Sequence, residues 1–224
     1  MSRGKLIVIE GADCTGKDTI IDSLNLPEDI FTISREPGGT EIGNDIRDVI
    51  LNISHLNIDD FTTFLLFSAN RRDHIVNKIV PEILSGKNVV LNRYYHSSVI
   101  YQGILGDGTI STKDIVKTTK MIMAGYEDMV KPDLVVSLYS SDLSIIEDRL
   151  NRKIKDRLEL NDMEYFKMVN NEYWNIHNNK YIKDIERGKP NIYLMIDISA
   201  FHNNIESMTD TIKGAIVNIT GGKY

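Results

Sequence analysis

The sequence contains one cysteine and no long apolar run. Cys14 is the single cysteine among 224 residues, so the chain cannot form an internal disulfide and no oxidising compartment is implied. No segment approaches the roughly 20 apolar residues of a membrane span. The apolar run that begins at Leu6 ends at Glu10, which is too short for the core of a signal peptide. We therefore expect a cytoplasmic protein without a membrane partner.

The sequence also lacks a surplus of positive charge. It has 26 Lys and Arg residues against 32 Asp and Glu residues, which gives a net charge of −6 at pH 7. Proteins that coat nucleic acid usually carry a basic surplus because they neutralise phosphates, so we expect no nucleic-acid partner. A small phosphate ligand in a local basic pocket remains compatible with this charge.

Five short segments are apolar and often β-branched, which is typical of buried parallel strands. The predicted strands are 6–10, 31–35, 88–92, 134–138 and 193–197. The predicted helices are 18–24, 42–51, 60–84, 112–126, 143–150, 163–176 and 205–219. This alternation predicts an α/β fold in which helices cover both faces of a five-stranded parallel sheet. No repeat or linker divides the chain, so we expect one domain over residues 1–224.

Residues 11–17, GADCTGK, match the first seven positions of the phosphate-binding motif G-x-x-x-x-G-K-[ST]. They follow a predicted strand and precede a predicted helix, which is the context that the motif requires. Gly11 and Gly16 permit the tight turn, the loop amides point at an anion, and Lys17 places its ammonium between the β- and γ-phosphates. We predict ATP binding by Gly11, Ala12, Asp13, Cys14, Thr15, Gly16, Lys17, Asp18 and Thr19.

The position after Lys17 departs from this motif. Asp18 stands where a Ser or Thr hydroxyl normally ligates Mg²⁺. Asp18 either binds the metal as a carboxylate or is an acid favoured by the dipole at the start of a helix. Thr19 is a weaker substitute, because a shift of one residue on a helix turns the side chain by about 100°.

Four further segments narrow the class of P-loop protein. They are REPGGT at 35–40, LFSANR at 66–71, NRY at 92–94 and SSVIYQG at 97–103. With the phosphate loop, and in this order, they resemble the thymidylate kinase family over nearly the whole chain. The resemblance implies a P-loop NTPase fold with a short lid near residues 150–160. It also implies an enzyme that transfers the γ-phosphoryl group of ATP, with Mg²⁺, to thymidine monophosphate (dTMP) for dTTP synthesis.

The same resemblance assigns side chains to the base and to the acceptor phosphate. Phe67 would stack on thymine, and Arg71, one helical turn later, would donate to O4, where cytosine carries an amino group. Arg47 and Arg93 would hold the acceptor phosphate, because guanidinium forks suit phosphate oxygens. Core packing is the alternative for Phe67, and a solvated helix charge is the alternative for Arg47.

Five more side chains complete the acceptor site by resemblance. Ser98 and Gln102, four residues apart on a predicted helix, would contact the edge of thymine. Tyr101 would lie near the sugar and exclude ribonucleotides at the 2′ carbon. Asp13 would accept from the 3′-hydroxyl, and Glu36 would orient the acceptor arginines or cap a turn.

One departure from the family pattern concerns the metal. The family usually has Asp-Arg-Tyr where this chain has NRY, so the carboxylate that holds the Mg²⁺ water shell is replaced by Asn92. Mg²⁺ favours carboxylate and water oxygens. Our hypothesis is that Asp18 supplies the charge that Asn92 lacks, and Glu10 is a second nearby carboxylate that would share this task.

Catalytic cations are expected in the phosphate loop and the lid. Some thymidylate kinases carry a catalytic arginine in the loop, where this chain has Cys14, and others supply basic residues from the lid. The segment DRLE at 156–159 resembles the lid exit of the family. Phosphoryl transfer needs cations around the equatorial oxygens. The predicted catalytic residues are Lys17, Arg93, Arg149, Arg152 and Arg157, although a charge run is often only a solvated face.

Alternative functions and the oligomeric state remain open at this stage. The first alternative is a deoxynucleoside monophosphate kinase of broader or modified-pyrimidine specificity, or a deoxynucleoside kinase, although Asn92 cannot be the base that the latter uses. The second is a non-catalytic P-loop nucleotide-binding module. The family forms homodimers, so we expect a homodimer, which apolar Phe61, Phe64 and Ile75 would suit as readily as a monomer's core would use them.

Overall fold

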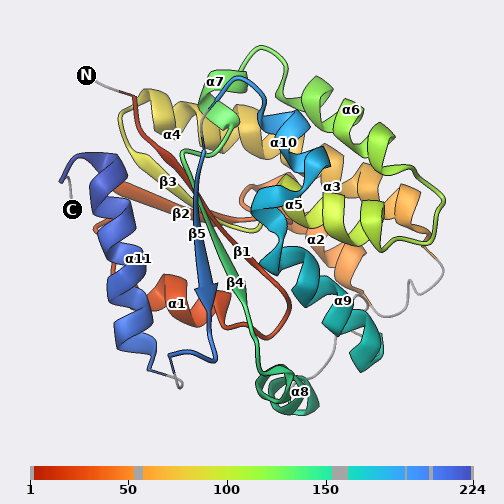
Figure 1. Cartoon of the computed structure of the whole chain (residues 1–224). Helices are drawn as coiled ribbons and strands as arrows, with labels where there is room; N and C mark the ends of the chain where they lie inside the picture. Colours follow the sequence, from red (N-terminus) through yellow and green to blue (C-terminus); the bar gives the residue numbers. More distant parts are fainter. Residues whose placement is uncertain (1–2, 53–57, 153–160, 190, 202–203, 223–224) are drawn as a thin grey trace.

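Five parallel strands form the centre of the molecule, in the order β2-β3-β1-β4-β5 (Figure 1). They are β1 (Leu6–Gly11), β2 (Phe31–Arg35), β3 (Asn88–Asn92), β4 (Leu134–Tyr139) and β5 (Ile192–Asp197). This computed structural model describes residues 3–52, 58–152, 161–189, 191–201 and 204–222. The predicted α/β fold is confirmed, and each predicted strand agrees with the observed strand to within one residue at either end.

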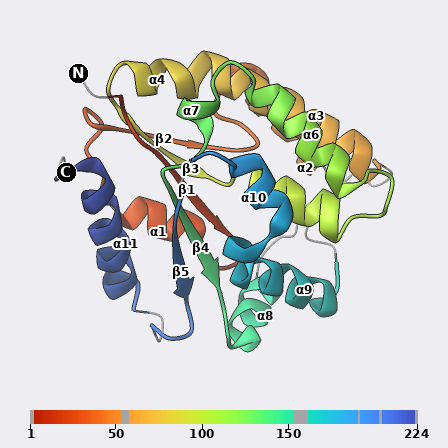
Figure 2. The same cartoon turned by 45° about the horizontal axis from the view of Figure 1, so that its top comes forward.

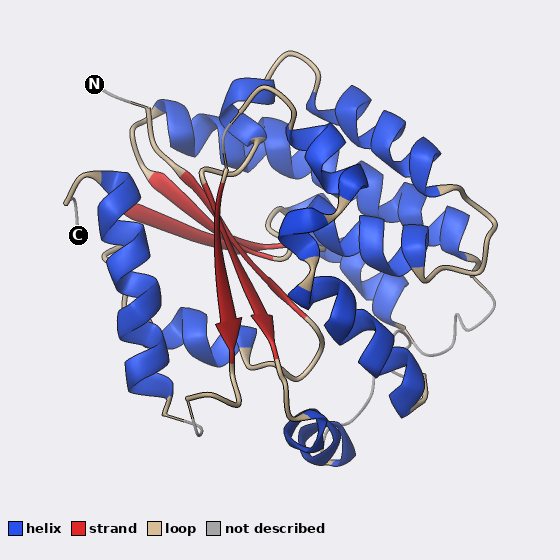
Figure 3. Ribbon diagram, viewed as in Figure 1, coloured by secondary structure: helices blue, strands red, loops and turns tan. Residues whose placement is uncertain are grey.

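The central strands are apolar because both faces of the sheet are covered. Leu6 and Val8 of β1 contribute to one buried cluster, whereas Ile7 and Ile9 point into the other. Helices α1 (Lys17–Ser23) and α11 (Ile205–Thr220) cover the face of Ile7 and Ile9. The remaining helices lie mainly over the opposite face, as the turned view and the ribbon diagram show (Figure 2, Figure 3).

Each predicted helix range holds a helix in the structure, α5 begins the helix expected to carry Ser98 and Gln102, and α7 and α10 are additions that the spacing did not indicate. Among the described residues, no helix combines the length and apolar character needed to cross a membrane. The α-helices other than α1 and α11 are α2 (Glu41–Leu51), α3 (Asp60–His74), α4 (Val80–Leu84), α5 (Tyr95–Ser98), α6 (Thr112–Met123), α7 (Glu127–Val130), α8 (Leu143–Asn151), α9 (Met163–Trp174) and α10 (Lys180–Glu186).

The long helix predicted over 60–84 is interrupted in the structure. A π-helical turn, Ile75–Ile79, joins α3 to α4. Pro81, the second residue of α4, lies just beyond this turn, and its ring nitrogen cannot donate to the carbonyl oxygen four residues earlier. A second π-helical turn, Val99–Ile104, continues α5. The register of the helical faces therefore changes at both places.

The strand order decides which loops meet. β3 lies between β1 and β2, so the segments that follow these three strands lie side by side at one edge of the sheet. Arg93 directly follows β3 and its backbone N–H donates to the carbonyl oxygen of Ile9, at 3.0 Å. Ligands of open parallel sheets bind at this edge.

Candidate active site

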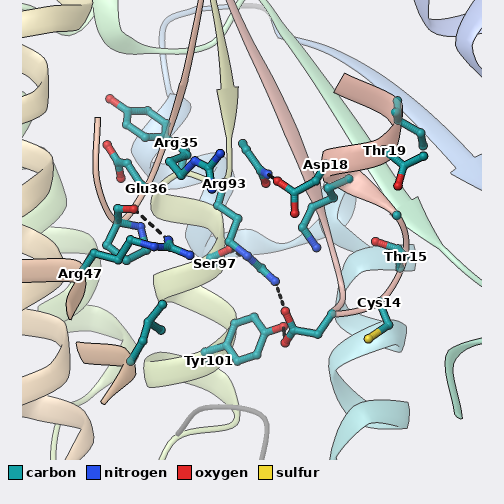
Figure 4. A pocket seen from close by; sticks show the side chains of 18 of the residues that line it. Cys14, Thr15, Asp18, Thr19, Arg35, Glu36, Arg47, Arg93, Ser97 and Tyr101 are labelled. Carbon is teal, nitrogen blue, oxygen red and sulfur yellow. Dashed lines mark hydrogen bonds and ion pairs between the residues drawn. The ribbon is translucent and has the colours of Figure 1, made fainter. Parts of the chain in front are cut away.

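A cavity of about 580 Å³ opens at the carboxyl edge of the sheet. In Figure 4, Arg47 and Glu36 lie on one side of it, Cys14 and Thr15 lie on the other, and Arg93 reaches between them. The structure brings most of the predicted site residues to this cavity. Those that line it are Asp13, Cys14, Thr15, Gly16, Lys17, Asp18, Thr19, Glu36, Arg47, Phe67, Arg71, Arg93, Ser98, Tyr101, Gln102 and Arg149.

The phosphate loop needs glycine at its two ends. Gly11 has φ +153°, and a Cβ there would lie 2.6 Å from the carbonyl oxygen of Leu138. Gly16 has φ +89° and caps α1. Between them, Cys14 adopts φ +62°, a region that non-glycine residues seldom occupy. These backbone angles curl the loop so that its interior faces the cavity.

Lys17 lies folded against the loop. Its Nζ donates to the carbonyl oxygens of Gly11, at 2.9 Å, and of Ala12, at 2.7 Å. Burial, followed by repulsion from Arg93, lowers the pKa of Lys17 to about 7. Gly11 and Ala12 thus serve the site through their carbonyl oxygens. An anion in the loop would give the ammonium a stronger partner than these neutral oxygens.

Arg93 stands at the centre of the site with a left-handed backbone, φ +68°. Its Nη2 pairs with the Asp13 carboxylate, and its Nη1 donates to the carbonyl oxygen of Gly11 at 3.2 Å. Nη1 also donates to the hydroxyls of Ser97, at 3.1 Å, and Tyr173, at 3.2 Å. Although burial opposes it, Asp13 and the other neighbours raise the pKa of Arg93 well above its usual value, so the guanidinium is charged.

Arg71 is almost wholly buried on α3, with 1% of its surface exposed. Its Nε donates to Glu36 Oε2 at 2.8 Å, and its Nη2 donates to Ser98 Oγ at 3.1 Å. Its Nη1 has no hydrogen-bond partner among the described residues. Half-buried Phe67 precedes it by one turn on the same helix, and buried Gln102 also lines the cavity. A flat ring and an unsatisfied donor therefore meet in one part of the cavity.

The expected role of Glu36 needs a correction. Its two oxygens contact Arg71 and His74, the latter through Nδ1 at 3.2 Å. It therefore orients the arginine of the predicted base site instead of the acceptor arginines, and it does not merely cap a turn. Arg47 is held separately, since its Nη1 donates to the carbonyl oxygen of Pro37 at 3.0 Å.

Asp13 joins the phosphate loop to the π-helical turn after α5. It accepts from the hydroxyl of Tyr101 at 2.9 Å, on the oxygen that Arg93 does not contact. The guanidinium of Arg93 lies 5.5 Å from the centre of the Tyr101 ring. These contacts hold a carboxylate and a phenol ring together at the cavity wall.

The two candidate metal carboxylates lie in different surroundings. Asp18 is exposed, lines the cavity and accepts from Asn92 Nδ2 at 2.8 Å. Glu10 is fully buried and accepts from the backbone N–H of Tyr94, at 2.7 Å, and from two hydroxyls. The expectation that Glu10 helps to hold Mg²⁺ is therefore wrong, because protein donors occupy its oxygens away from the cavity.

The three lid arginines differ as well. Arg149 Nη1 donates to the carbonyl oxygen of Cys14 at 2.9 Å, which brings α8 over the phosphate loop. The Arg152 side chain is 81% exposed, lies 4.0 Å from Asp148 and does not line the cavity. Arg157 and residues 153–160 of the predicted lid lie outside the described residues. In the described part of the chain, Arg149 is thus the lid arginine beside the loop.

Several residues of the site escaped the sequence analysis. Arg35 and Pro37 line the cavity and were visible as parts of the REPGGT segment. Leu51, Ser97, Ile205 and Met208 also line it. Ile205 and Met208 come from α11, and no local pattern indicates that this helix reaches the cavity. Asn70 pins the loop after β2, because its side-chain amide donates to the carbonyl oxygen of Gly38 and accepts from its N–H.

A comparison with families of known proteins supports the same reading of the site. The sequence model described as thymidylate kinase matches residues 9–194, which is most of the chain. The matched range includes the phosphate loop, the segment after β2, Phe67, Arg71 and Arg93. The chain belongs to the thymidylate kinase family, and its activity is the transfer of a phosphoryl group from ATP to dTMP.

Proposed function

We propose that the cavity holds ATP on the phosphate loop and dTMP between α2, α3 and the π-helical turn after α5, and that Arg93 bridges the two. The observation that carries this proposal is the position of Arg93, which contacts Gly11 and Asp13 of the loop and lies opposite Arg47 in the same cavity (Figure 4). Two anionic substrates need cations at the point where they meet.

The proposed reaction is an in-line transfer. An oxygen of the dTMP phosphate forms a bond to the γ-phosphorus, the bond from that phosphorus to the β–γ bridging oxygen breaks, and ADP leaves with those electrons. The attacking oxygen is already ionised, so no general base is required. Arg47 and Arg93 hold the acceptor phosphate, and Lys17 and Arg149 balance the charge on the transferred group. Cys14 takes no part in this scheme except through its carbonyl oxygen, which holds Arg149.

Base selection rests on Phe67 and Arg71. The ring of Phe67 offers a stacking surface for thymine. The Nη1 donor of Arg71 lacks a protein partner among the described residues and is nearly inaccessible to water, so an acceptor such as thymine O4 would satisfy it. The amino group of cytosine would leave it unsatisfied. Ser98 and Gln102 complete this end, with Ser98 fixing the guanidinium of Arg71.

Sugar selection rests on Asp13 and Tyr101. Asp13 would accept a hydrogen bond from the 3′-hydroxyl. Tyr101 is held by Asp13 and would oppose a 2′-hydroxyl by steric contact. The hydrogen bond between these two side chains supports a single arrangement of the sugar end, which favours deoxyribonucleotides.

Asp18 is the proposed protein carboxylate for Mg²⁺. It follows Lys17 in the loop, reaches the cavity and keeps one oxygen on Asn92. In the described part of the chain, no group of three or more His, Cys, Asp or Glu side chains could hold a metal ion. One carboxylate with water and substrate phosphates matches the way Mg²⁺ is usually bound. When bound, Mg²⁺ neutralises charge on the phosphates of ATP.

We further propose a cytoplasmic homodimer of this single domain. Phe64 and Ile75 are fully buried in the core, so they are not available to a partner as the sequence had allowed. Phe61 and Leu65, four residues apart on α3, are 45% and 49% exposed. Their exposure on α3, between β2 and β3, supports a dimer contact at this helix. Sedimentation of the purified protein, wild type and Leu65→Glu, tests it.

The test of the function is ATP consumption with a panel of acceptors. Consumption that requires dTMP, with little for dCMP and none for thymidine, is the expected result. Comparable rates with several deoxynucleoside monophosphates would favour the broader kinase. Rates with free nucleosides would favour a deoxynucleoside kinase. An absence of any transfer, at adequate Mg²⁺, would favour the non-catalytic module and overturn the proposal.

A further inference from the structure

His96 is buried between two carboxylates behind the active site. It lies on α5, three residues after Arg93, and is fully buried. Its Nε2 hydrogen-bonds Glu186 Oε1 at 3.1 Å, and its Nδ1 lies at ion-pair distance, 3.5 Å, from Glu10 Oε1. Tyr95 stacks on its ring. Because the two carboxylates outweigh burial, the pKa of His96 is raised to about 9, and the ring is an imidazolium at neutral pH.

Glu186 anchors the outer side of this arrangement. It lies on α10 and is itself the acceptor for two tyrosine hydroxyls, Tyr95 at 2.9 Å and Tyr193 at 2.8 Å. These neutral donors hold Glu186 in place without supplying positive charge. Glu186 therefore fixes the ring of His96 from the side that faces away from the cavity.

Glu10 connects the imidazolium to the active site. One of its oxygens faces His96 and accepts from the backbone N–H of Tyr94. The other accepts from the hydroxyls of Ser97, at 2.9 Å, and Tyr173, at 3.1 Å. The two hydroxyl oxygens also lie 2.8 Å apart, so one hydroxyl can donate to the other. An ionised carboxylate has only acceptor sites, so a hydroxyl bonded to Glu10 donates its proton to it.

The orientation of these two hydroxyls determines whether they can accept hydrogen bonds from Arg93. Since their protons are directed to Glu10 or to each other, Ser97 and Tyr173 present lone pairs to the guanidinium and accept from Nη1. Ser97 lies beside Arg93 in Figure 4. A continuous chain of contacts therefore runs from Glu186 through His96, Glu10 and the two hydroxyls to Arg93.

We propose that His96 is a positioning residue for acceptor binding: it keeps Glu10 an ionised acceptor, and Glu10 aims the hydroxyls that hold Arg93. This inference rests on the proposed role of Arg93 at the acceptor phosphate. Without the cation, a carboxylate buried as Glu10 is would take up a proton, because burial disfavours its charged form. A protonated Glu10 donates one hydrogen bond, so the hydroxyl that accepts it loses Glu10 as the acceptor for its own proton, which weakens the arrangement that holds Arg93.

The test uses variants chosen for charge. His96→Gln leaves two buried carboxylates without a cation and risks misfolding. Glu186→Gln keeps the Glu10–His96 pair and serves as the control of similar volume. The double variant, H96Q with E186Q, removes both the cation and the outer carboxylate, so its buried charge equals that of the wild type. Thermal unfolding and circular dichroism show which variants are folded.

The measurement compares the change in the KM for dTMP with the change in the KM for ATP. In the folded double variant, the KM for dTMP should rise about ten-fold, as expected for a lost hydrogen bond to a charged group, and the KM for ATP should stay within about two-fold. E186Q alone should keep both values near wild type. Glu10→Gln, in which the carboxylate is replaced by an uncharged amide, should reproduce the rise for dTMP. Calorimetric titration with dTMP should show the same loss of affinity.

Two results would overturn the inference. One is a folded double variant with an unchanged KM for dTMP, and the other is an equal rise in E186Q alone, which would assign the effect to α10 packing. Both are separate from failure of the proposed function, because a wild-type enzyme that cannot use dTMP would fail in the acceptor panel before any variant is made.

Discussion

Asn92 at the end of β3 donates a 2.8 Å hydrogen bond to Asp18 on the first turn of α1, beside the phosphate loop. The family usually carries a carboxylate at the strand position. In this protein the carboxylate, Asp18, is on the helix and an amide, Asn92, is on the strand. The contact fixes one carboxylate oxygen of Asp18 at the cavity. A change at either residue should therefore alter how the enzyme uses Mg²⁺.

Asp18→Ala should lower kcat/KM for ATP about 10–100-fold and shift the Mg²⁺ requirement upward, in the range found when groups around a metal site are changed. Asp18→Thr with Asn92→Asp, which moves the carboxylate to the strand, should recover most of the loss. Calorimetric titration with ATP, with and without Mg²⁺, gives a second readout. Asp22→Ala, on an exposed position of α1, is the control. Normal turnover and Mg²⁺ dependence in D18A would rule out the metal role.

Phe67→Ala should raise the KM for dTMP about 5- to 150-fold, which corresponds to a base-stacking contribution of about 1–3 kcal/mol. The KM for ATP should not change. Thr62→Ala is a control on the same helix, because that side chain is exposed and does not line the cavity. Steady-state kinetics with both variants distinguish stacking from general disturbance of α3. Equal effects of the two changes would argue against base stacking by Phe67.

Arg71→Met alone should destabilise the protein by about 3–5 kcal/mol, because it leaves Glu36 buried without its cation. Adding Glu36→Gln should restore most of that stability without restoring base selection. In the double variant, the ratio of kcat/KM for dTMP to that for dCMP should fall at least about ten-fold. Chemical unfolding and paired kinetic assays measure the two effects separately. A selectivity that survives in the double variant would remove Arg71 from base recognition.

ATP binding should take up close to one proton at pH 8. The pKa of Lys17 is about 7 without ligand, so at this pH the amine is mostly neutral. The phosphates of ATP favour its charged form and raise the pKa, which draws a proton from the buffer. Calorimetry in two buffers of different ionisation enthalpy measures this uptake. Lys17→Met should abolish it, and uptake that persists in this variant would assign the proton to another group.

The contribution of His96 to the free energy of unfolding should fall as the pH rises from 6.5 to 9, whereas Lys17, whose pKa is lowered from 10.5 to about 7, contributes in the opposite sense above pH 7. The folded-state pKa of His96 is raised from 6.5 to about 9, so its contribution is fully present below pH 6.5 and lost as the pH passes 9. The loss should be on the order of 2–3 kcal/mol. The pKa values of Glu10 and Glu186 are lowered, so their contribution is lost on the acid side, below about pH 4.5. Urea unfolding of the wild type and of the H96Q, E186Q variant isolates the His96 contribution, because the difference between their free energies of unfolding should shrink as the pH rises from 6.5 to 9.

The sequence predicted most of what local chemistry determines. Strands buried on both faces are short continuous apolar runs, so β1 and β3 were placed to within a residue. The phosphate loop follows from glycines and a lysine at fixed spacing. Phe67 and Arg71 required the family resemblance, because a helical aromatic and a nearby arginine are as common in cores and on surfaces as in sites.

The rest depends on contacts between distant segments. His96 and Glu186 lie 90 positions apart and meet only because α10, a helix that the spacing did not reveal, packs near α5. Glu36 was assigned to the wrong arginines because the sequence shows its strand-end position but not that Arg71 and His74 face it from α3. In the sequence, Glu10 is a carboxylate beside the phosphate loop, as a metal ligand would be. Only its burial in the structure excludes that role.

The pairing register of β1 and β3 sets the spacing between the phosphate loop and Arg93, and so between the phosphoryl donor and acceptor. Ile9 pairs with Asn92, and just beyond this pair the Glu10 side chain accepts from the backbone N–H of Tyr94, two residues after Asn92. A slip of one residue in this register would carry Arg93 about 3.3 Å from the loop and reverse which side of the sheet each side chain faces. Under the proposed function, alignment of the two phosphates is therefore a property of the rigid framework of the sheet.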